Sequence, residues 1–305
     1  MKNSYYSLIC MLLFSCGNVT PKHEYRIIYE FENIEKVSAN DKHGTVQTLN
    51  NRLDKIASDI EVKLNNKQQI EVKLSTDFEL ERLNAIITNR GKLEFWECIK
   101  IDEIDYFFIE ANAVFKTEKD TLNPFFDLME YRGYYNGELF SVAVKDTSLM
   151  RTYLNKKEVK SLLKGEFRYT KFLFGKPDID NNVPLFAVKS NKGNKAYVNQ
   201  THITNARQSY SQTNRPTITM QMNSQGANRW ERMTEIAYQQ GSQIAITLNG
   251  IVYSAPSVSV GAIKGGNTEL SGDFTLEEAQ DLAYILSANK SIPKLKFVNA
   301  SAIND

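Results

Sequence analysis

Side chains that could do acid–base or metal chemistry are scattered through this 305-residue chain. The three histidines, His23, His43 and His202, lie far apart in the sequence. None of them belongs to an HExxH pair or lies near a CxxC pair, which are spacings that bind zinc. We therefore expect no metal and no cofactor, and we interpret each histidine as a surface or loop residue.

Other patterns associated with catalysis are incomplete. Residues 175–177, Gly-Lys-Pro, lack the first glycine spacing and the Ser or Thr of a phosphate-binding loop, and the chain has no GxSxG segment. Asp102, Glu103 and Asp105 form a charge cluster without a partner pattern, which is typical of a solvated face. The three lysines within residues 189–195 indicate a solvated turn. We expect that the protein is not an enzyme.

Residues 243–297 contain the positions that set turns and helix ends. Residues 243–248 and 251–254 are predicted strands, and Asn249-Gly250 between them supplies the positive φ pair of a type I′ turn. Pro256 ends the second strand because proline cannot donate to a sheet. The fold-setting residues that we single out are Asn249, Gly250, Pro256, Gly265, Gly266, Gly272, Thr275 and Glu278.

The second half of this stretch predicts a turn, a helix and a final strand. Gly265-Gly266 makes the turn before a short strand at residues 268–271. Thr275 and Glu278 form a capping box at the start of the helix, with Phe274 and Ala279 placed as a hydrophobic staple. Residues 294–298 read as the last strand.

In this order the stretch resembles the first periplasmic domain, P1, of SecD, the auxiliary subunit of the bacterial protein-export translocon. The segments that carry the resemblance are residues 248–250, 252–256, 265–266, 271–279 and 292–297. The resemblance implies an extracytoplasmic module with base and head subdomains, which in the family contacts emerging polypeptide. Residues 51–54 and 93–95 are similar to motifs of the family's base.

The first hundred residues predict the order strand, helix, strand, strand, helix, strand. The last strand of this set is expected at residues 92–96. Two helices on one face of such an antiparallel sheet form a ferredoxin-like unit. The resemblance also implies that a C-terminal helix and strand return to complete this base.

We therefore expect an α+β fold, with a ferredoxin-like base subdomain and an inserted small α+β head subdomain. The predicted boundaries are residues 25–100 for the first part of the base, 101–200 for an insertion, 201–272 for the head and 273–298 for the last helix and strand of the base. The insertion is expected to elaborate this domain, with no role assigned.

Two residues leave alternatives open. An exposed Trp230 could hold an extended polypeptide, but its spacing with Ala227, Thr234 and Ala237 favours a core position on a helix. Cys98 is expected to be a small buried side chain in a strand.

Residues 1–16 read as a targeting segment that does not belong to the fold. Residues 13–16, Leu-Phe-Ser-Cys, resemble a bacterial lipobox, which predicts lipidation of Cys16. Phe14 departs from the small or aliphatic residue usual at that position, and a plain secretory signal is the alternative. An uncleaved anchor is excluded because seven apolar residues cannot span a bilayer core of about 30 Å.

The lipobox and the resemblance together predict a lipid-anchored protein of the bacterial cell envelope that faces the periplasm. The outer membrane is slightly favoured, since no acidic residue follows Cys16. Expected partners are unfolded or exported polypeptides, translocon components, and the bilayer through acylated Cys16. The net charge of +1 argues against nucleic acid. The alternative is a structural or assembly lipoprotein of another envelope complex that reuses the fold.

Overall fold

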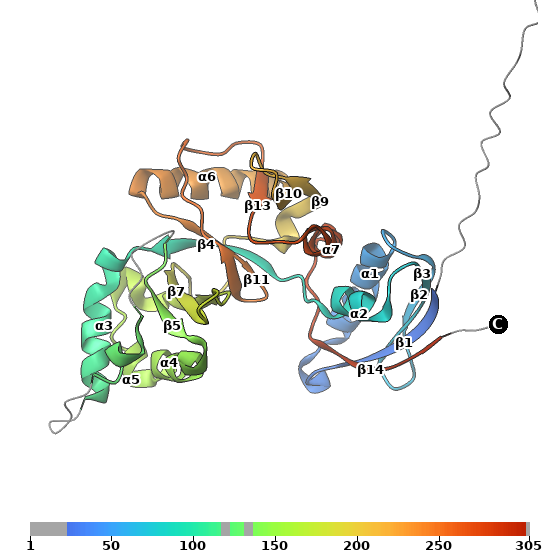
Figure 1. Cartoon of the computed structure of the whole chain (residues 1–305), viewed down its shortest axis with the longest axis horizontal. Helices are drawn as coiled ribbons and strands as arrows, with labels where there is room; N and C mark the ends of the chain where they lie inside the picture. Colours follow the sequence, from blue (N-terminus) through green and yellow to red (C-terminus); the bar gives the residue numbers. More distant parts are fainter. Residues whose placement is uncertain (1–22, 117–122, 131–136, 303–305) are drawn as a thin grey trace, which may run out of the picture.

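Three sheets organise residues 23–116, 123–130 and 137–302, which are the residues that the computed structural model describes. The base sheet forms one lobe, and the head sheet lies beside it above a central sheet (Figure 1). The third lobe, formed by residues from the predicted insertion, lies at the far end from the base. The protein is an α+β protein, as the sequence predicts. Residues 1–16, including Cys16, lie outside the described residues.

The base holds four antiparallel strands in the order β14-β1-β3-β2. Its elements are β1 (His23–Phe31), η1 (Ile34–Lys36), α1 (Ala39–Leu53), β2 (Ser58–Leu64), β3 (Ile70–Thr76), α2 (Leu80–Thr88) and β14 (Leu295–Ala302). Ile27, Tyr29, Leu49, Val72 and Leu83 are buried in its core. The two helices and the sheet therefore bury one shared apolar layer.

The predicted last strand of the base lies elsewhere. The strand that begins at Leu93, β4 (Leu93–Ile99), pairs with β11 in the central sheet, and β14 takes the fourth place in the base. The physical reason is burial. Six of the seven residues of β4 are buried, as in a strand covered on both faces, whereas only Leu295 is buried in β14.

The head sheet has the order β13-β10-β9. The elements of the head are η5 (Gln200–His202), β9 (Ile203–Tyr210), β10 (Pro216–Met222), α6 (Ser224–Gln240) and β13 (Asn267–Leu270). Asn223 caps α6 by accepting from the Gly226 N–H, and Gly241 ends it with φ 62°. The spacing of Ala227, Trp230, Thr234 and Ala237 predicts the helix that the structure shows as α6.

Helix α7 (Leu276–Ser287) packs between the head and the base. Its side chains Ala279, Leu282 and Leu286 belong to the same buried cluster as Ile218 and Met220 of β10. The expected contact of this helix with the base is present, but most of its buried face packs on the head sheet. Its apolar residues also contact Ile86 of α2, which belongs to the same buried cluster, and Asp281 of its polar face pairs with Arg82.

The central sheet contains seven strands in the order β5-β7-β6-β12-β11-β4-β8, and β7 also pairs with β4. Besides β4 they are β5 (Phe140–Ala143), β6 (Lys171–Gly175), β7 (Asn182–Val188), β8 (Val198–Asn199), β11 (Ile244–Leu248) and β12 (Ile251–Ser254). The extra pairing closes β4, β7, β6, β12 and β11 into a ring. Cys98, Trp96 and Phe186 belong to one buried cluster of these strands. Burial raises the pKa of the Cys98 thiol to about 12, so it stays protonated at neutral pH.

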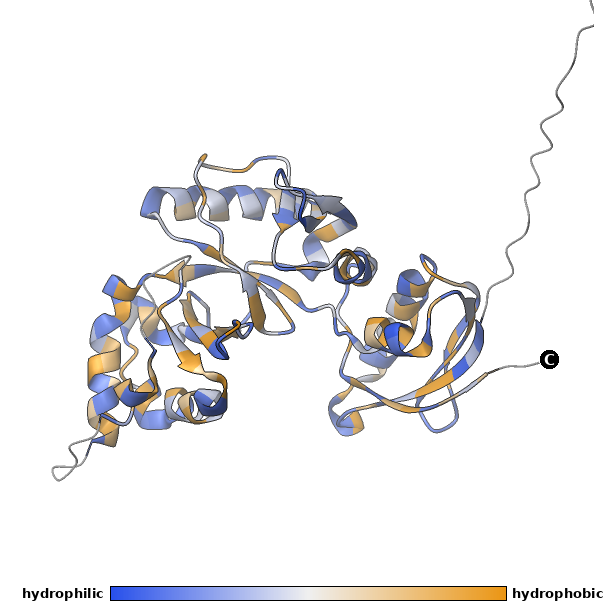
Figure 2. Cartoon of the chain, viewed as in Figure 1, coloured by the Kyte–Doolittle hydropathy of each residue, from blue (hydrophilic) through white to orange (hydrophobic). Residues whose placement is uncertain are grey.

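The predicted insertion contributes strands to this ring and helices beside it. The helices are α3 (Ile101–Phe115), η2 (Phe126–Leu128), η3 (Val144–Asp146), α4 (Thr147–Asn155), α5 (Lys157–Lys160) and η4 (Gly165–Tyr169). Asp102, Glu103 and Asp105 lie at the start of α3, where Glu103 accepts from the Lys100 N–H. Figure 2 shows hydrophobic residues along α3, and Tyr106 and Ile109 are 66% and 56% exposed.

The turn between β11 and β12 has the predicted conformation. Asn249 has φ 56° and Gly250 has φ 87°, so both central residues are left-handed, as a type I′ turn requires. A Cβ added at Gly250 would meet no atom within 4 Å. The cost of a side chain there is therefore a cost of backbone conformation alone.

Gly250→Val is expected to lower the free energy of unfolding by about 1–3 kcal/mol, because a β-branched residue is strained at positive φ. Urea unfolding followed by circular dichroism measures it. Gly44→Ala is the matched control, since Gly44 lies in α1 with open space around it and alanine favours a helix. Equal stability of Gly250→Val and the wild type would contradict the turn assignment.

Candidate functional site

A groove of about 630 Å³ lies beside strand β13 of the head. Met220, Trp230, Ile244 and Ile246 line it, and all four side chains are largely buried. Among the described residues β13 pairs only with β10, so its outer edge has no strand partner. An unpaired edge beside an apolar groove can accept an extended polypeptide as an added strand.

Trp230 forms part of the floor of this groove and is not an exposed side chain. Its side chain is 4% exposed, and its ring meets Phe95 edge-to-face with centroids 5.2 Å apart. The core interpretation of Trp230 is therefore confirmed, and the exposed alternative is wrong. This contact also joins α6 of the head to β4 of the central sheet.

The loop of residues 255–266 forms one wall of the groove and is fixed to α6. The Ile263 N–H donates to Thr234 Oγ1 at 2.8 Å, and this hydroxyl donates to the Trp230 carbonyl at 2.9 Å. At the outer side of the loop, Val260 is 82% exposed and lies one residue before Gly261, which is near the ring of Tyr238. The loop therefore presents an aliphatic side chain to solvent from a fixed backbone.

The Gly265-Gly266 pair places β13 against α6. The two residues have φ 80° and 71°, and a Cβ on Gly266 would lie 2.8 Å from Cβ of Ala227. The Gly266 carbonyl accepts from the Met222 N–H at 2.9 Å, which continues the pairing of β13 with β10. These glycines serve the predicted turn and also a close approach that the sequence did not indicate.

Pro256 lies near the start of the loop that borders the groove, and Gly272 follows strand β13 at its other end. The Pro256 carbonyl accepts from the Ile244 N–H at 3.1 Å, and Pro256 lines the groove. Gly272 lies against Phe274, because a Cβ there would be 3.0 Å from the ring. Phe274 in turn stacks on Tyr253 at 5.7 Å between centroids. The predicted positions are thus packing positions as well as turns.

The capping box at the start of α7 is present. The Glu278 N–H donates to Thr275 Oγ1 at 3.1 Å, and the Thr275 N–H donates to the Glu278 carboxylate at 2.9 Å. Asp281 of the same helix pairs with Arg82 of α2 at 2.7 Å. The helix is therefore held at its N-terminus and tied to the base on its polar face.

The side chain of Asn249 reaches the segment that joins α2 of the base to β4. Its Oδ1 accepts from the Lys92 N–H at 3.1 Å, and its Nδ2 donates to Asn89 Oδ1 at 3.0 Å. Its own N–H donates to the Lys92 carbonyl at 2.9 Å. Asn249 is therefore a link between the central sheet and the base as well as a turn residue.

Arg52 holds the same joining segment from the base side. Its guanidinium is fully buried, and Nη1 donates to the carbonyls of Ile86 and Asn89, both at 2.7 Å. Burial lowers the pKa of Arg52 to about 9, which still leaves it charged at neutral pH. The charge is compensated by carbonyl oxygens at the end of α2, where the helix dipole is negative.

The histidines take three separate positions, and the surface-or-loop interpretation is wrong for His202, which is buried. His23 lies in β1, 3.2 Å from a carboxylate oxygen of Glu79, and His43 lies exposed on α1. His202 is 4% exposed, accepts from the Asn199 N–H through Nδ1, and has its pKa lowered mainly by burial. Within the described part of the chain, no group of three or more His, Cys, Asp or Glu side chains could hold a metal ion.

Sequence comparison connects the groove to a known subdomain. The family model described as "SecDF, P1 head subdomain" matches residues 180–290, which include most of the groove lining. Protein translocase subunit SecD of Rhodothermus marinus is 33% identical over 169 residues, covering 54% of this chain and 26% of that protein. SecD of Rickettsia typhi is 31% identical over 109 residues, covering 36% and 20%. The chain spans about a quarter or less of the length of these relatives.

Structural comparison extends the likeness to most of the chain. A solved structure titled "Structure and function of a membrane component SecDF that enhances protein export" has a TM-score of 0.54 at 19% identity and covers 91% of this chain and 100% of its own. SecDF in its super-membrane-facing form also gives 0.54, at 18% identity, covering 92% and 30%. These values show the fold. The chain contains a SecD P1-like domain.

The described residues contain no helix with the length and hydrophobicity needed to span a membrane. Of the predicted fold-setting residues, Pro256 lines the groove, Gly265 and Gly266 form the turn before β13, and Asn249 lies in the β11–β12 turn. The sequence places Thr234 on the same helical face as Trp230, but it does not indicate that Thr234 anchors the loop at residues 255–266. Val258, which lines the groove from this loop, was not identified from the sequence.

Asn249→Gly is expected to lower the free energy of unfolding by about 1–3 kcal/mol. Glycine keeps the positive φ, whereas both side-chain hydrogen bonds to residues 89 and 92 are lost. Asn214→Gly is the matched control, because Asn214 has φ 59° in an exposed turn of the head. Chemical unfolding of both variants measures the difference. Equal stability of the two would contradict the linking role of Asn249.

Proposed function

We propose that this chain is an extracytoplasmic accessory to protein translocation that binds unfolded or exported polypeptides in the head groove. The observation that carries the proposal is the unpaired edge of β13 beside an apolar groove, within residues that match a SecDF P1 head subdomain. The relatives' printed name, protein translocase subunit SecD, supports a role in protein translocation. The groove beside β13 supports binding of an extended polypeptide.

A polypeptide adds to β13 through its backbone. An extended segment pairs with the outer edge of Asn267–Leu270, and alternate side chains then enter the groove over Trp230 and Met220. Backbone pairing makes the contact tolerant of sequence. Because β13 has only four residues, the pairing is short and the client is released easily. Weak, general contacts of this kind suit a chain that moves through the export pathway.

The polar rim supplies further contacts at the groove. Arg207 and Glu269 lie opposite each other across β10, since both are paired with Thr219, and both line the groove. Charges of both signs accommodate clients of either net charge. This arrangement supports a site without strong electrostatic selection.

Lipidation of Cys16 would place this module at a membrane surface. The fold begins at β1, in the base sheet, so the lipid would be joined to the base. The head elements β9, β10, β13 and α6, which contribute residues to the groove, lie in a separate lobe (Figure 1). We propose a location in the bacterial cell envelope, facing the periplasm, with the outer membrane slightly favoured and with translocon components as neighbours.

A second candidate function is that of a structural or assembly lipoprotein. It is favoured by the outward face of α3, where Tyr106 and Ile109 are exposed. Figure 2 shows hydrophobic residues along this helix. This face lies outside the residues that match the head subdomain. A protein that works by assembly would recover one stoichiometric partner and no unfolded clients.

Val258→Asp is expected to weaken binding of an unfolded, fluorescently labelled model polypeptide by about 5- to 30-fold, because a charge replaces an aliphatic side chain that lines the groove. Fluorescence anisotropy measures the affinity. Ile179→Asp is the matched control, since Ile179 is 94% exposed on the β6–β7 turn, away from the groove. Absence of saturable binding by the wild type, or equal losses in both variants, would contradict the proposal.

A further inference from the structure

A second cavity, of about 490 Å³, lies in the lobe formed by residues 101–200 and has a basic lining. Five cationic side chains line it and no acidic one does, and they come from α4, α5, η4, β6 and a loop at residues 190–194. They are Arg151, Lys160, Arg168, Lys171 and Lys192. Sequence analysis assigned Lys192 to a solvated turn and gave the other four no role, because they become neighbours only in the fold.

The charge of this cavity is largely uncompensated. Lys160, Arg168 and Lys192 have no ion-pair partner among the described residues. Lys171 lies 4.0 Å from Glu94, but the same carboxylate is shared with Lys92 at 2.9 Å. Burial lowers the pKa of Lys171, as expected for a cation that lacks a full counter-charge.

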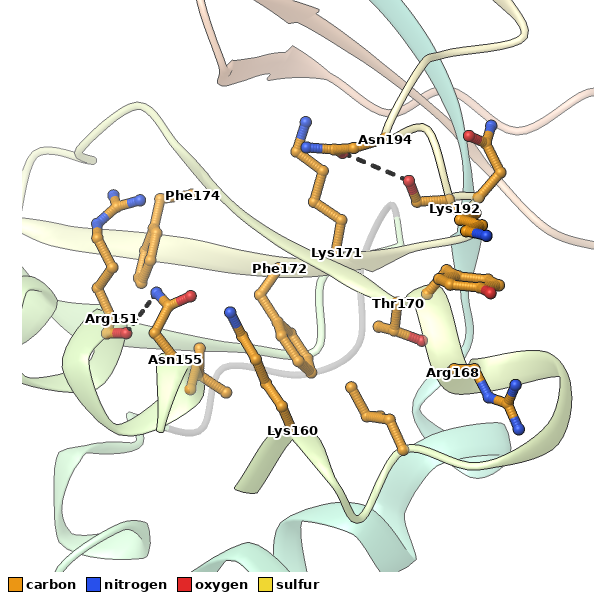
Figure 3. Close-up of a pocket in the computed structure, with 15 residues that line it drawn as sticks. Arg151, Asn155, Lys160, Arg168, Thr170, Lys171, Phe172, Phe174, Lys192 and Asn194 are labelled. Atoms are coloured by element: carbon orange, nitrogen blue, oxygen red, sulfur yellow. Dashed lines mark hydrogen bonds between the residues drawn. The ribbon is translucent and has the colours of Figure 1, made fainter. Parts of the chain in front are cut away.

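Aromatic rings hold two of the cations in place. The guanidinium of Arg151 lies 4.6 Å from the centroid of Phe174, and Nζ of Lys171 lies 4.5 Å from that of Trp96. Figure 3 shows Lys160 extending toward Phe172, with Arg151 beside Phe174 and Arg168 at the margin. Cations positioned by cation–π contacts lose less conformational entropy when an anion binds.

The cavity also has an apolar part and an unused polar atom. Leu154, Leu163 and Phe172 line it together with the cations. The hydroxyl oxygen of Thr170 lines the same cavity, is buried, and has no hydrogen-bond partner among the described residues. A buried hydroxyl without a partner is unfavourable unless a ligand or water supplies one.

We propose that this cavity binds a phosphomonoester carried on an apolar group. The phosphate has up to two negative charges and three acceptor oxygens, which match the free cations and the Thr170 hydroxyl. The apolar group packs against Leu154, Leu163 and Phe172. The cavity volume falls within the range of about 300–1,000 Å³ that is typical of small-molecule sites. The ligand is either a lipid with a terminal phosphate or a soluble phosphorylated molecule.

This site is independent of the polypeptide groove. The lining residues of this cavity from Arg151 to Phe174 lie outside the matched residues 180–290. No residue lines both this cavity and the groove. A failure of polypeptide binding would therefore leave this inference standing, and the reverse also holds.

Isothermal titration of the full chain with phenyl phosphate tests the inference. We expect saturable binding that weakens as salt is raised and that falls by about tenfold or more in the double variant Lys160→Gln, Lys192→Gln. Lys145→Gln is the matched control, because Lys145 is exposed on η3 and does not line the cavity. The control is expected to bind as the wild type does.

Vesicle flotation then separates the two sources of the phosphate. Cation-dependent binding to phosphatidic acid vesicles, and not to phosphatidylcholine vesicles, would support the lipid source. Phenyl phosphate binding without vesicle binding would support the soluble source. No saturable binding of phenyl phosphate, or equal binding by the double variant, would overturn the inference. Binding of an acidic peptide in the absence of phenyl phosphate binding would also overturn it.

Discussion

The structure depends on how residues 89–92 are held where the chain passes from the base to the central sheet. Buried Arg52 donates to carbonyls at the end of α2, and Asn249 bonds to Asn89 and Lys92 from the opposite side. The returning chain lies alongside, since the Ile292 N–H donates to the Arg90 carbonyl at 2.9 Å. The segment that leaves the base and the segment that returns to it are therefore joined by one hydrogen-bond network. This network sets where the head lies relative to the base.

The head uses this fixed position to present its groove. Trp230 joins α6 to β4, and Thr234 joins α6 to the loop at residues 255–266, so the groove is built on supported elements. The unpaired edge of β13 then offers backbone pairing while the floor offers apolar contact. The basic cavity lies in a different lobe and has different chemistry. In our proposals, one chain carries a general site for extended polypeptide and a separate, more selective site for an anionic ligand.

Local patterns predicted the parts of this structure that depend on neighbouring residues. The Asn249-Gly250 turn, the Thr275–Glu278 capping box and the burial of Trp230 all follow from short-range spacing. The sheet to which β4 belongs could not be predicted from local patterns. Its residues suit either the base sheet or the central sheet, and only long-range strand pairing decides between the two. The basic cavity was also hidden, since Arg151 and Lys192 are distant in sequence. Helix α3 was missed because its first turn was read as a solvated acidic cluster.

The most direct test of the account is site-specific photo-cross-linking in living cells. A photoreactive amino acid is placed at Val258, which lines the groove, and in a second strain at Ile179, an aliphatic position in another lobe that is 94% exposed. The account predicts that position 258 captures many unrelated exported polypeptides and that position 179 captures far fewer. Capture of one fixed envelope protein from position 258, or equal capture from both positions, would contradict it.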